Sequence, residues 1–340
     1  MKRIFLGLIV LAVYSSCNKV NNLVDPTIAT DLPDIVVTGP KINNNFIQAN
    51  KTYNLLGYGY DVTGKYADTS AVRSSAINVA ALDINNPYSV NFNGSTYSGW
   101  ETINAVDAAD YSSQLSNMLS ETTGLNQFKG SITTPFPGQN SFSPKYIYAS
   151  YSYIFRHKKI AITADYDLLK HYLTPAFIQD SQNLTPADLV KKYGTHILAD
   201  ISIGAKLNVT YQAETTSPTR KAALKAGFNY AMGKVFNLFT GSLDPINTTD
   251  LQTVSSPKIV YDAIGADLSK IKVNTTTSTP TVEIIDWANS STASGAAFIG
   301  IGIKKNSLIP LHELISDPVQ KTAVKTYIAG YLTSQQVKLN

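Results

Sequence analysis

Cysteine is almost absent from this chain: Cys17 is the single cysteine among 340 residues. A lone thiol excludes internal disulfide bridges, and it excludes the cysteine clusters that hold structural zinc. Because Cys17 lies near the start of the chain, outside the expected folded domain, that domain also has no cysteine nucleophile. Thiol chemistry is therefore excluded for the domain.

Charged residues are also scarce, at 15% of the chain, whereas tyrosine alone contributes 20 residues. This composition suits the surface of an exported, β-rich protein. The formal net charge is +4, and loss of Lys2 and Arg3 with a leader lowers it by two, to +2. Such a charge is too small for electrostatic capture of nucleic acid or anionic lipid. We therefore expect no nucleic-acid partner.

The N-terminal apolar run, residues 4–13, is too short to cross a bilayer as a helix, which takes about 20 residues. It follows two basic residues and precedes two small serines, which is the pattern of a secretion signal. Cys17 comes directly afterwards, where a bacterial lipoprotein signal places its acylated cysteine. We predict a lipoprotein signal peptide over residues 1–16 and a lipid on Cys17. A buried N-terminal helix and an inert cysteine are the alternatives.

The rest of the chain divides into two parts. Residues 17–45 are rich in Asn, Pro, Thr and Asp with little periodicity, which is typical of a flexible tether. No second linker follows, so residues 46–335 are predicted to form one domain. The expected location is the outer membrane, as a lipoprotein exposed on the cell surface or released.

Recognisable catalytic machinery is missing. Neither G-x-S-x-G nor H-E-x-x-H occurs, and the four histidines show no metal-ligand spacing. Residues 59–66 nearly spell a phosphate-binding loop, but Tyr66 stands where magnesium coordination needs Ser or Thr. His196 comes just after a helix-ending glycine, and we expect it to anchor that turn by hydrogen bonds. The sequence therefore predicts no enzyme, no cofactor and no metal site.

Residues 197–214 alternate between apolar or small side chains at odd positions and mostly polar ones at even positions. The alternation fails only at Leu198. At about 3.3 Å per residue such a strand extends for roughly 60 Å, which is unusual for a compact domain. A helix is predicted just before it, because Thr185 can cap its start and Gly194 can end it.

The apolar residues in the range 221–239 fit both the helical period and the two-residue period of a β-strand. Their apolar side chains recur at helical spacing, yet many also share the even positions that one face of a strand requires. Two interpretations stay open: a core helix that fits both patterns by chance, and a helix that converts into a membrane-spanning β-hairpin. The candidate membrane-inserting residues are Leu224, Phe228, Tyr230, Met232, Phe236 and Leu238.

A second, weaker insert of this kind lies between residues 103 and 136. Tyr111, Leu115, Met118 and Leu119 form a helical stripe in it. A long aromatic strand is predicted next, over residues 145–163. The layout of a helical insert beside a long strand therefore occurs twice.

The tetrad Tyr193-Gly194-Thr195-His196, followed after seven residues by Gly204-Ala205, resembles the signature of the MACPF (membrane attack complex/perforin) family. The family pattern is aromatic-Gly-Thr/Ser-His followed by Gly-Gly. Ala205 stands in place of the second glycine and predicts that the strand bends less freely there. Weaker matches are residues 55–68, residues 264–269, Trp287 and residues 309–315.

The resemblance implies an α+β, MACPF/CDC-like fold: a bent, four-stranded antiparallel sheet flanked by two helical clusters. In the family these clusters unfurl into transmembrane hairpins after the subunits form a ring. The implied function is a pore-forming, toxin-like protein, with an antimicrobial role as one candidate. The implied partners are a target membrane lipid or a surface receptor, and further copies of the chain in a ring or arc. The alternative is a non-lytic surface binding or adhesion lipoprotein with the same fold.

Overall fold

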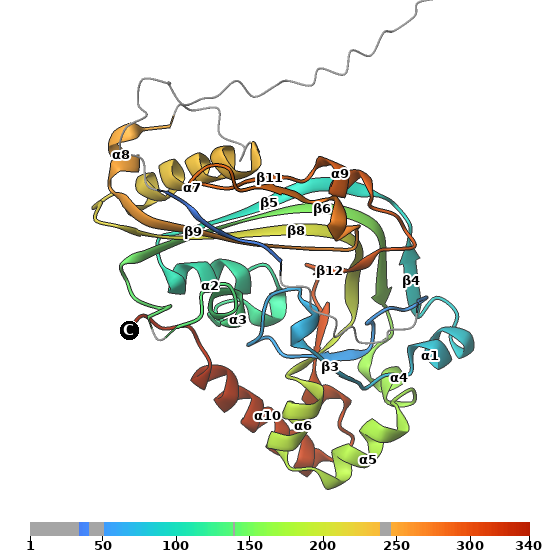
Figure 1. Cartoon of the computed structure of the whole chain (residues 1–340). Helices are drawn as coiled ribbons and strands as arrows, with labels where there is room; N and C mark the ends of the chain where they lie inside the picture. Colours follow the sequence, from blue (N-terminus) through green and yellow to red (C-terminus); the bar gives the residue numbers. More distant parts are fainter. Residues whose placement is uncertain (1–33, 41–50, 139, 239–245) are drawn as a thin grey trace, which may run out of the picture.

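The computed structural model describes residues 34–40, 51–138, 140–238 and 246–340 (Figure 1). The predicted signal peptide, Cys17 and most of the predicted tether lie outside these residues. Within the tether range, residues 34–40 belong to the fold, because strand β1 (Val36–Thr38) pairs with the central sheet.

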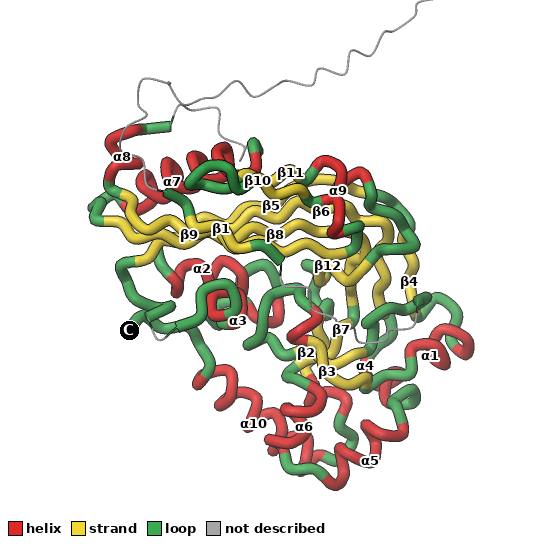
Figure 2. Tube along the Cα trace, in the orientation of Figure 1, coloured by secondary structure: helices red, strands yellow, loops and turns green. Residues whose placement is uncertain are grey.

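A seven-stranded sheet forms one layer of the molecule, and four long antiparallel strands make up its centre (Figure 2). They are β5 (Tyr97–Ala105), β6 (Tyr146–Ile162), β8 (Asp200–Thr215) and β9 (Val254–Ile264). Three short strands extend the sheet: β1 pairs in parallel with β9, β4 (Val90–Asn93) with β6, and β12 (Ala297–Ile301) with β8. The predicted four-stranded antiparallel core is confirmed.

The sheet bends beside Gly204 of β8, and Figure 1 shows the strands turning down toward β4. A β-bulge in β6 leaves His157 as the extra residue between Arg156 and Lys158, opposite this point. Bulges bend a strand and increase its twist. The odd-numbered residues of β8 stay buried on both sides of Gly204, but they pack in different hydrophobic cores.

The strand predicted over residues 197–214 is divided at Ala199. Strand β7 (His196–Leu198) leaves the central sheet and joins a four-stranded sheet with β2 (Tyr58–Tyr60), β3 (Val72–Ser75) and β13 (Leu308–Pro310). The backbone N–H groups of Ala199 and Asp200 both donate to the Ser307 carbonyl oxygen, at 3.0 and 3.2 Å. The division follows Leu198, the position where the alternation fails.

Two helical inserts connect the central strands and cover opposite faces of the sheet (Figure 1). The first, between β5 and β6, contains α2 (Ala108–Ser116), a 3₁₀ turn (Ser120–Thr122) and α3 (Gly130–Thr133). The second, between β8 and β9, contains α7 (Arg220–Phe236) and α8 (Thr248–Gln252). Two flanking clusters are thus confirmed.

Most of the remaining helices lie around the smaller sheet and at the far end of the bend, whereas α9 (Ile285–Asn289), β10 (Lys272–Asn274) and β11 (Thr281–Glu283) lie on the α7 side of the central sheet (Figures 1 and 2). The helices of the first group are α1 (Val79–Asn85), α4 (Tyr166–Lys170), α5 (Pro175–Asn183), α6 (Pro186–Tyr193) and α10 (Pro318–Ser334). Of these, α10 packs on α6.

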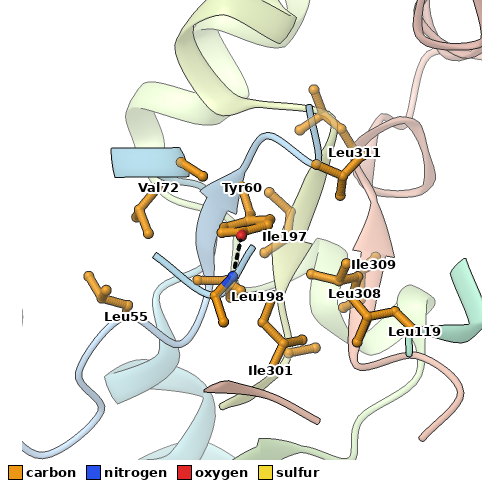
Figure 3. Close-up of a cluster of buried hydrophobic side chains, with 14 of the residues drawn as sticks. Leu55, Tyr60, Val72, Leu119, Ile197, Leu198, Ile301, Leu308, Ile309 and Leu311 are labelled. Atoms are coloured by element: carbon orange, nitrogen blue, oxygen red, sulfur yellow. Dashed lines mark hydrogen bonds between the residues drawn. The ribbon is translucent and has the colours of Figure 1, made fainter. Parts of the chain in front are cut away.

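The buried apolar side chains form two cores. The larger core joins the smaller sheet, the first insert and the far end of the bend, and Figure 3 shows part of it around Tyr60, Ile197 and Leu308. The second core lies between α7 and the sheet and includes Tyr211, Phe228 and Trp287. Each fully buried large apolar side chain contributes about 1.5–3 kcal/mol. Of the helices in the described ranges, none combines the length and apolar character needed to cross a membrane.

Candidate membrane-insertion elements and signature turn

The signature turn begins where α6 ends. Thr185 caps the start of this helix: its Oγ1 accepts from the Asp188 N–H at 3.2 Å and donates to the Asp188 carboxylate at 2.7 Å. Gly194 ends it with φ 75° and ψ −167°, a conformation that is essentially restricted to glycine. A Cβ at Gly194 would also collide with the Tyr60 backbone. The predicted N-cap at Thr185 and the predicted helix end at Gly194 are confirmed.

Thr195 fastens the turn to the smaller sheet. Its N–H donates to the Tyr60 carbonyl oxygen at 3.0 Å, and its own carbonyl oxygen accepts from the Leu311 N–H at 3.0 Å. Its Oγ1 accepts from the Val62 N–H at 3.2 Å. The turn therefore holds β2 and β13 together.

His196 is buried in this turn, and its Nδ1 lies 2.9 Å from Thr195 Oγ1. Burial, assisted by His312, lowers the pKa of His196 to about 4. The imidazole is therefore neutral at pH 7, and its contact with the Thr195 hydroxyl group lies within the turn itself.

Gly204 and Ala205 lie at the bend of the central sheet. A side chain at Gly204 would collide with the Phe155 carbonyl oxygen, so the close approach of β6 requires glycine there. The Ala205 methyl group is fully buried in the second core and faces the α7 side of the sheet. The sheet bends here with alanine in place of the second glycine.

Helix α7 buries most of its surface against the sheet. The Phe228 ring lies 5.6 Å from that of Tyr211, and the Phe236 ring lies edge-on to that of Tyr261 at 5.4 Å. Leu224 and Met232 are also buried, Tyr230 is 9% exposed and Leu238 is partly buried. Side chains of both strand parities are buried in this helix: Ala223, Leu224, Ala226, Phe228, Tyr230, Ala231, Met232, Val235 and Phe236.

The first insert packs on the opposite face. Tyr111 of α2 lies 6.1 Å from Tyr148 of β6, measured between ring centroids. Its interior also contains hydrogen-bonded polar groups: Ser112 Oγ donates to the Gln127 carbonyl oxygen, and Gln127 Nε2 donates to the Leu332 carbonyl oxygen at 3.0 Å. Of the predicted helical stripe, Tyr111 and Leu115 are buried in α2, whereas Leu119, also buried, and Met118, partly buried, follow the end of that helix.

Arg220, which sequence reasoning missed, links the two inserts. It is the first residue of α7, yet its Nε donates to the Val106 carbonyl oxygen at 2.9 Å and its Nη2 to the Tyr146 carbonyl oxygen at 2.8 Å. A cation in the first turn opposes the helix dipole. That unfavourable placement is the one signal in the sequence that points to another role for Arg220.

A second missed contact holds the sheet to the loop after β2. The Lys65 ammonium pairs with Asp68 at 3.1 Å and with Asp262 of β9 at 2.5 Å. Burial opposes the charge of Lys65, but the two carboxylates outweigh it and raise the pKa of this lysine. Among the described residues, no group of His, Cys, Asp and Glu side chains is placed to hold a metal ion.

All four central strands meet the inserts at one end of the sheet. The register pairs Ala105, the last residue of β5, with Tyr148 near the start of β6. Tyr146, the first residue of β6, is paired with Glu214 near the end of β8, and Thr215 is paired with Val254 at the start of β9. Each insert is therefore the connection of a long antiparallel hairpin, and both hairpins have their tips on the same side.

Solved structures with this architecture identify the fold. GNIP1Aa from Chromobacterium piscinae superposes with a TM-score of 0.62 and 16% identity, covering 83% of this chain and 56% of its own. A putative cell invasion protein with a MAC/Perforin domain from Bacteroides thetaiotaomicron superposes with a TM-score of 0.65 and 14% identity, covering 89% of this chain and 63% of its own. The chain thus spans less than two thirds of either protein. No family model and no curated protein matches the sequence. With its bent antiparallel core and two flanking helical inserts, the chain has the fold of the MACPF proteins.

Proposed function

We propose that this protein forms pores: copies assemble edge to edge on a target membrane and convert the two helical inserts into membrane-spanning β-hairpins. The observation that carries the proposal is that both inserts connect neighbouring long strands at the same end of the sheet. Unrolling an insert would lengthen strands that already exist, with no change in their order. No enzymatic role is part of the proposal.

The second insert suits this conversion best. A transmembrane strand needs about 9–11 residues with one apolar face, and α7 together with its flanking residues is long enough to supply this. Its apolar side chains are covered by the sheet in the packed state, so the monomer hides them from water. Open strand edges are costly in lipid, so hairpins from many copies must close a barrel together.

The setting proposed for this activity is a lipid-anchored, exported protein attached through Cys17, at the outer membrane or on the cell surface. The description of the Bacteroides protein as a putative cell invasion protein supports a cell membrane as the target, reached through lipid or a receptor. An antimicrobial role is one form that such an activity would take.

A liposome dye-release assay tests the proposal, and a disulfide lock sharpens it. A Cβ at Gly227 of α7 would lie 3.3 Å from both Cγ atoms of Val254 on β9, which suits a disulfide between cysteines at these positions, but it would also meet the buried Tyr211 hydroxyl group at 2.5 Å. In a Cys17→Ser, Tyr211→Phe background, which removes that hydroxyl group, Gly227→Cys combined with Val254→Cys should block leakage when oxidised and restore it when reduced. The reduced form of the same protein is the matched control. Equal leakage from both forms would refute the conversion of α7.

One observation favours the alternative, a non-lytic binding or adhesion lipoprotein. The first insert buries Ser112, Ser116, Thr122 and Gln127, and their hydrogen bonds would be lost in a lipid-facing hairpin. Absence of leakage from vesicles made of native target lipids, together with saturable binding to those vesicles, would favour this alternative.

A further inference from the structure

A cavity of about 680 Å³ lies inside the bend, on the sheet face opposite α7. Its walls come from β5, β6, β8 and β12, from helix α2, and from the loop that carries Lys65 and Tyr66. This volume falls within the range of about 300–1,000 Å³ that is typical of small-molecule sites. The proposed hairpin conversion makes no use of it.

Two cations on neighbouring strands line this cavity. Arg156 of β6 is opposite Gly204 of β8, and Lys206 is opposite Ile154, so the two cations are diagonal neighbours in the register. Diagonal neighbours on one face of an antiparallel sheet lie about 7–8 Å apart, within reach of long side chains. One anionic group between them can therefore contact both.

The described partners of these two cations are uncharged. The Arg156 guanidinium lies over the Tyr97 ring at 5.4 Å, and its Nε is buried with no hydrogen-bond partner in the part of the chain that the structure describes. The Lys206 ammonium donates to the Ala67 carbonyl oxygen at 3.1 Å. Burial lowers the pKa of Lys206 although Asp262 and Asp68 attract its charge from farther away. An anion in the cavity would stabilise both cations.

The acidic groups near the cavity leave room for such an anion. Asp68 and Asp262 lie outside the lining and both pair with Lys65, whose single positive charge offsets one of the two carboxylates. Glu101 is the acidic residue of the lining; it lies at an exposed position of β5, and its attraction for Lys206 is weaker than that of Asp262 or Asp68. The lining therefore carries more positive than negative charge.

One part of the remaining lining suits a polyhydroxylated molecule, whereas aliphatic side chains such as Ile103, Leu115 and Ile154 form apolar walls that suit the faces of a sugar ring. Ser152 Oγ donates to Asn208 Oδ1 at 2.9 Å, and Asn208 Nδ2 lies 3.3 Å from Thr210 Oγ1, so hydroxyl and amide groups form a row along the sheet. Tyr111 of α2 and Tyr97 of β5 also line the cavity. Hydroxyl and amide groups both donate and accept hydrogen bonds, as sugar hydroxyls require.

We propose that this cavity binds a small anionic sugar, whose carboxylate or phosphate contacts Arg156 and Lys206 and whose hydroxyls contact Ser152 and Asn208. Because α2 forms one wall, the cavity exists in full only while the first insert is packed on the sheet. A ligand that binds one state of a protein stabilises that state. The sugar anion would therefore hold the first insert in place, a consequence that rests on the proposed pore-forming function.

Binding is tested first with the full chain in solution, by calorimetry and thermal unfolding. The probes are glucose 6-phosphate and glucuronate, with glucose and inorganic phosphate as controls for the sugar and the anion alone. We expect at least one sugar anion to bind saturably and raise Tm, and each control to bind about tenfold more weakly or worse. No saturable binding of either sugar anion up to about 10 mM, or equal binding of glucose, would overturn the proposal.

Variants then place the site. Arg156→Gln and Lys206→Met should each weaken binding by about tenfold or more, because a charge-assisted hydrogen bond is lost. Lys191→Gln, at an exposed position of α6, is the control and should bind as the wild type does. Circular dichroism and the Tm without ligand show whether each variant folds. If Lys206→Met does not fold, the affinity of Arg156→Gln alone tests the assignment. Wild-type affinity in a folded Arg156→Gln protein contradicts the assignment.

The coupling to pore formation is measured separately. Glucose 6-phosphate should slow dye release by the wild type and leave that by Arg156→Gln unchanged. If the protein releases no dye, the pore proposal fails while calorimetry still tests the cavity. Saturable binding with unchanged dye release would refute the coupling and keep the site.

Discussion

At the scale of single residues, the signature tetrad acts as a structural clamp. Gly194 adopts a conformation that is essentially restricted to glycine and lies against the Tyr60 backbone, while Thr195 and His196 hydrogen-bond within the same turn. The tetrad joins α6 to two strands of the smaller sheet. Its residues are therefore expected to matter for stability first and for assembly only indirectly.

Gly194→Ala should lower the free energy of unfolding by about 3 kcal/mol or more, because the backbone becomes strained and the new methyl group meets Tyr60. Gly233→Ala is the matched control, since Gly233 is an exposed residue of α7 with open space where a Cβ would be. That change should be neutral or stabilising by up to about 1 kcal/mol. Urea denaturation of both variants decides, and equal destabilisation would contradict the clamp.

His196 should make stability depend on pH. Its folded pKa of about 4 lies below the usual 6.5, so between these values the unfolded state binds more protons. Stability is therefore complete above pH 6.5 and falls as pH drops toward 4, by on the order of 3 kcal/mol. His196→Gln should flatten this part of the curve, as measured by unfolding at several pH values. His312, whose pKa burial also lowers, contributes in the same direction and remains in the variant.

At the scale of elements, the sequence predicted those that depend on local signals. The α6 helix has its cap, its first-turn proline and its terminal glycine within ten residues, so its bounds follow from the sequence. Strand β6 and helix α7 were found from their periodicity. The division at Ala199 was signalled by Leu198, but its cause was not readable, because it depends on hydrogen bonds to Ser307 more than a hundred residues away.

The contacts between elements could not be predicted. Arg220, the Lys65–Asp262 pair and the cavity inside the bend all depend on which strands become neighbours. β1 was assigned to the tether because three paired residues are too few to show a period. Long-range pairing, not local propensity, determines these features.

Arg220→Gln should loosen the second insert. The variant loses two hydrogen bonds from a charged group to the Val106 and Tyr146 carbonyl oxygens, each worth about 1.5–3 kcal/mol. We expect faster amide exchange in α7 and, if the pore proposal holds, faster dye release. Lys221→Gln, at the exposed neighbouring position, should change neither. Unchanged exchange in α7 would show that Arg220 does not hold the insert.

At the scale of the whole molecule, the two edges of the central sheet differ. The edge of β5 is not covered by another strand in the described part of the chain, whereas β1 pairs with three residues of β9. β1 is further held by Ile35, which is 1% exposed in the second core and whose N–H donates to Thr279 Oγ1 at 3.2 Å. Assembly through the β9 edge would first require β1 to leave.

Ile35→Asp should therefore release β1, because a carboxylate cannot remain in that core without a large cost. The expected results are faster amide exchange along β9 and faster formation of oligomers on vesicles. Val36→Asp is the matched control, since the Val36 side chain is 59% exposed and points away from the core. Hydrogen exchange and light scattering measure the two effects. Identical behaviour of both variants would contradict the covering role of β1.

The position of β1 also has a mechanical consequence. If Cys17 carries a lipid, the chain from residue 17 to residue 34 can extend for at most about 60 Å before it becomes taut. Tension between the bilayer and the body would then act first on the three paired residues of β1, ahead of the long strands. Such a force would arise when a neighbouring copy pulls the body away from its anchor. It would separate β1 from β9 and leave the β9 edge free to pair with that copy.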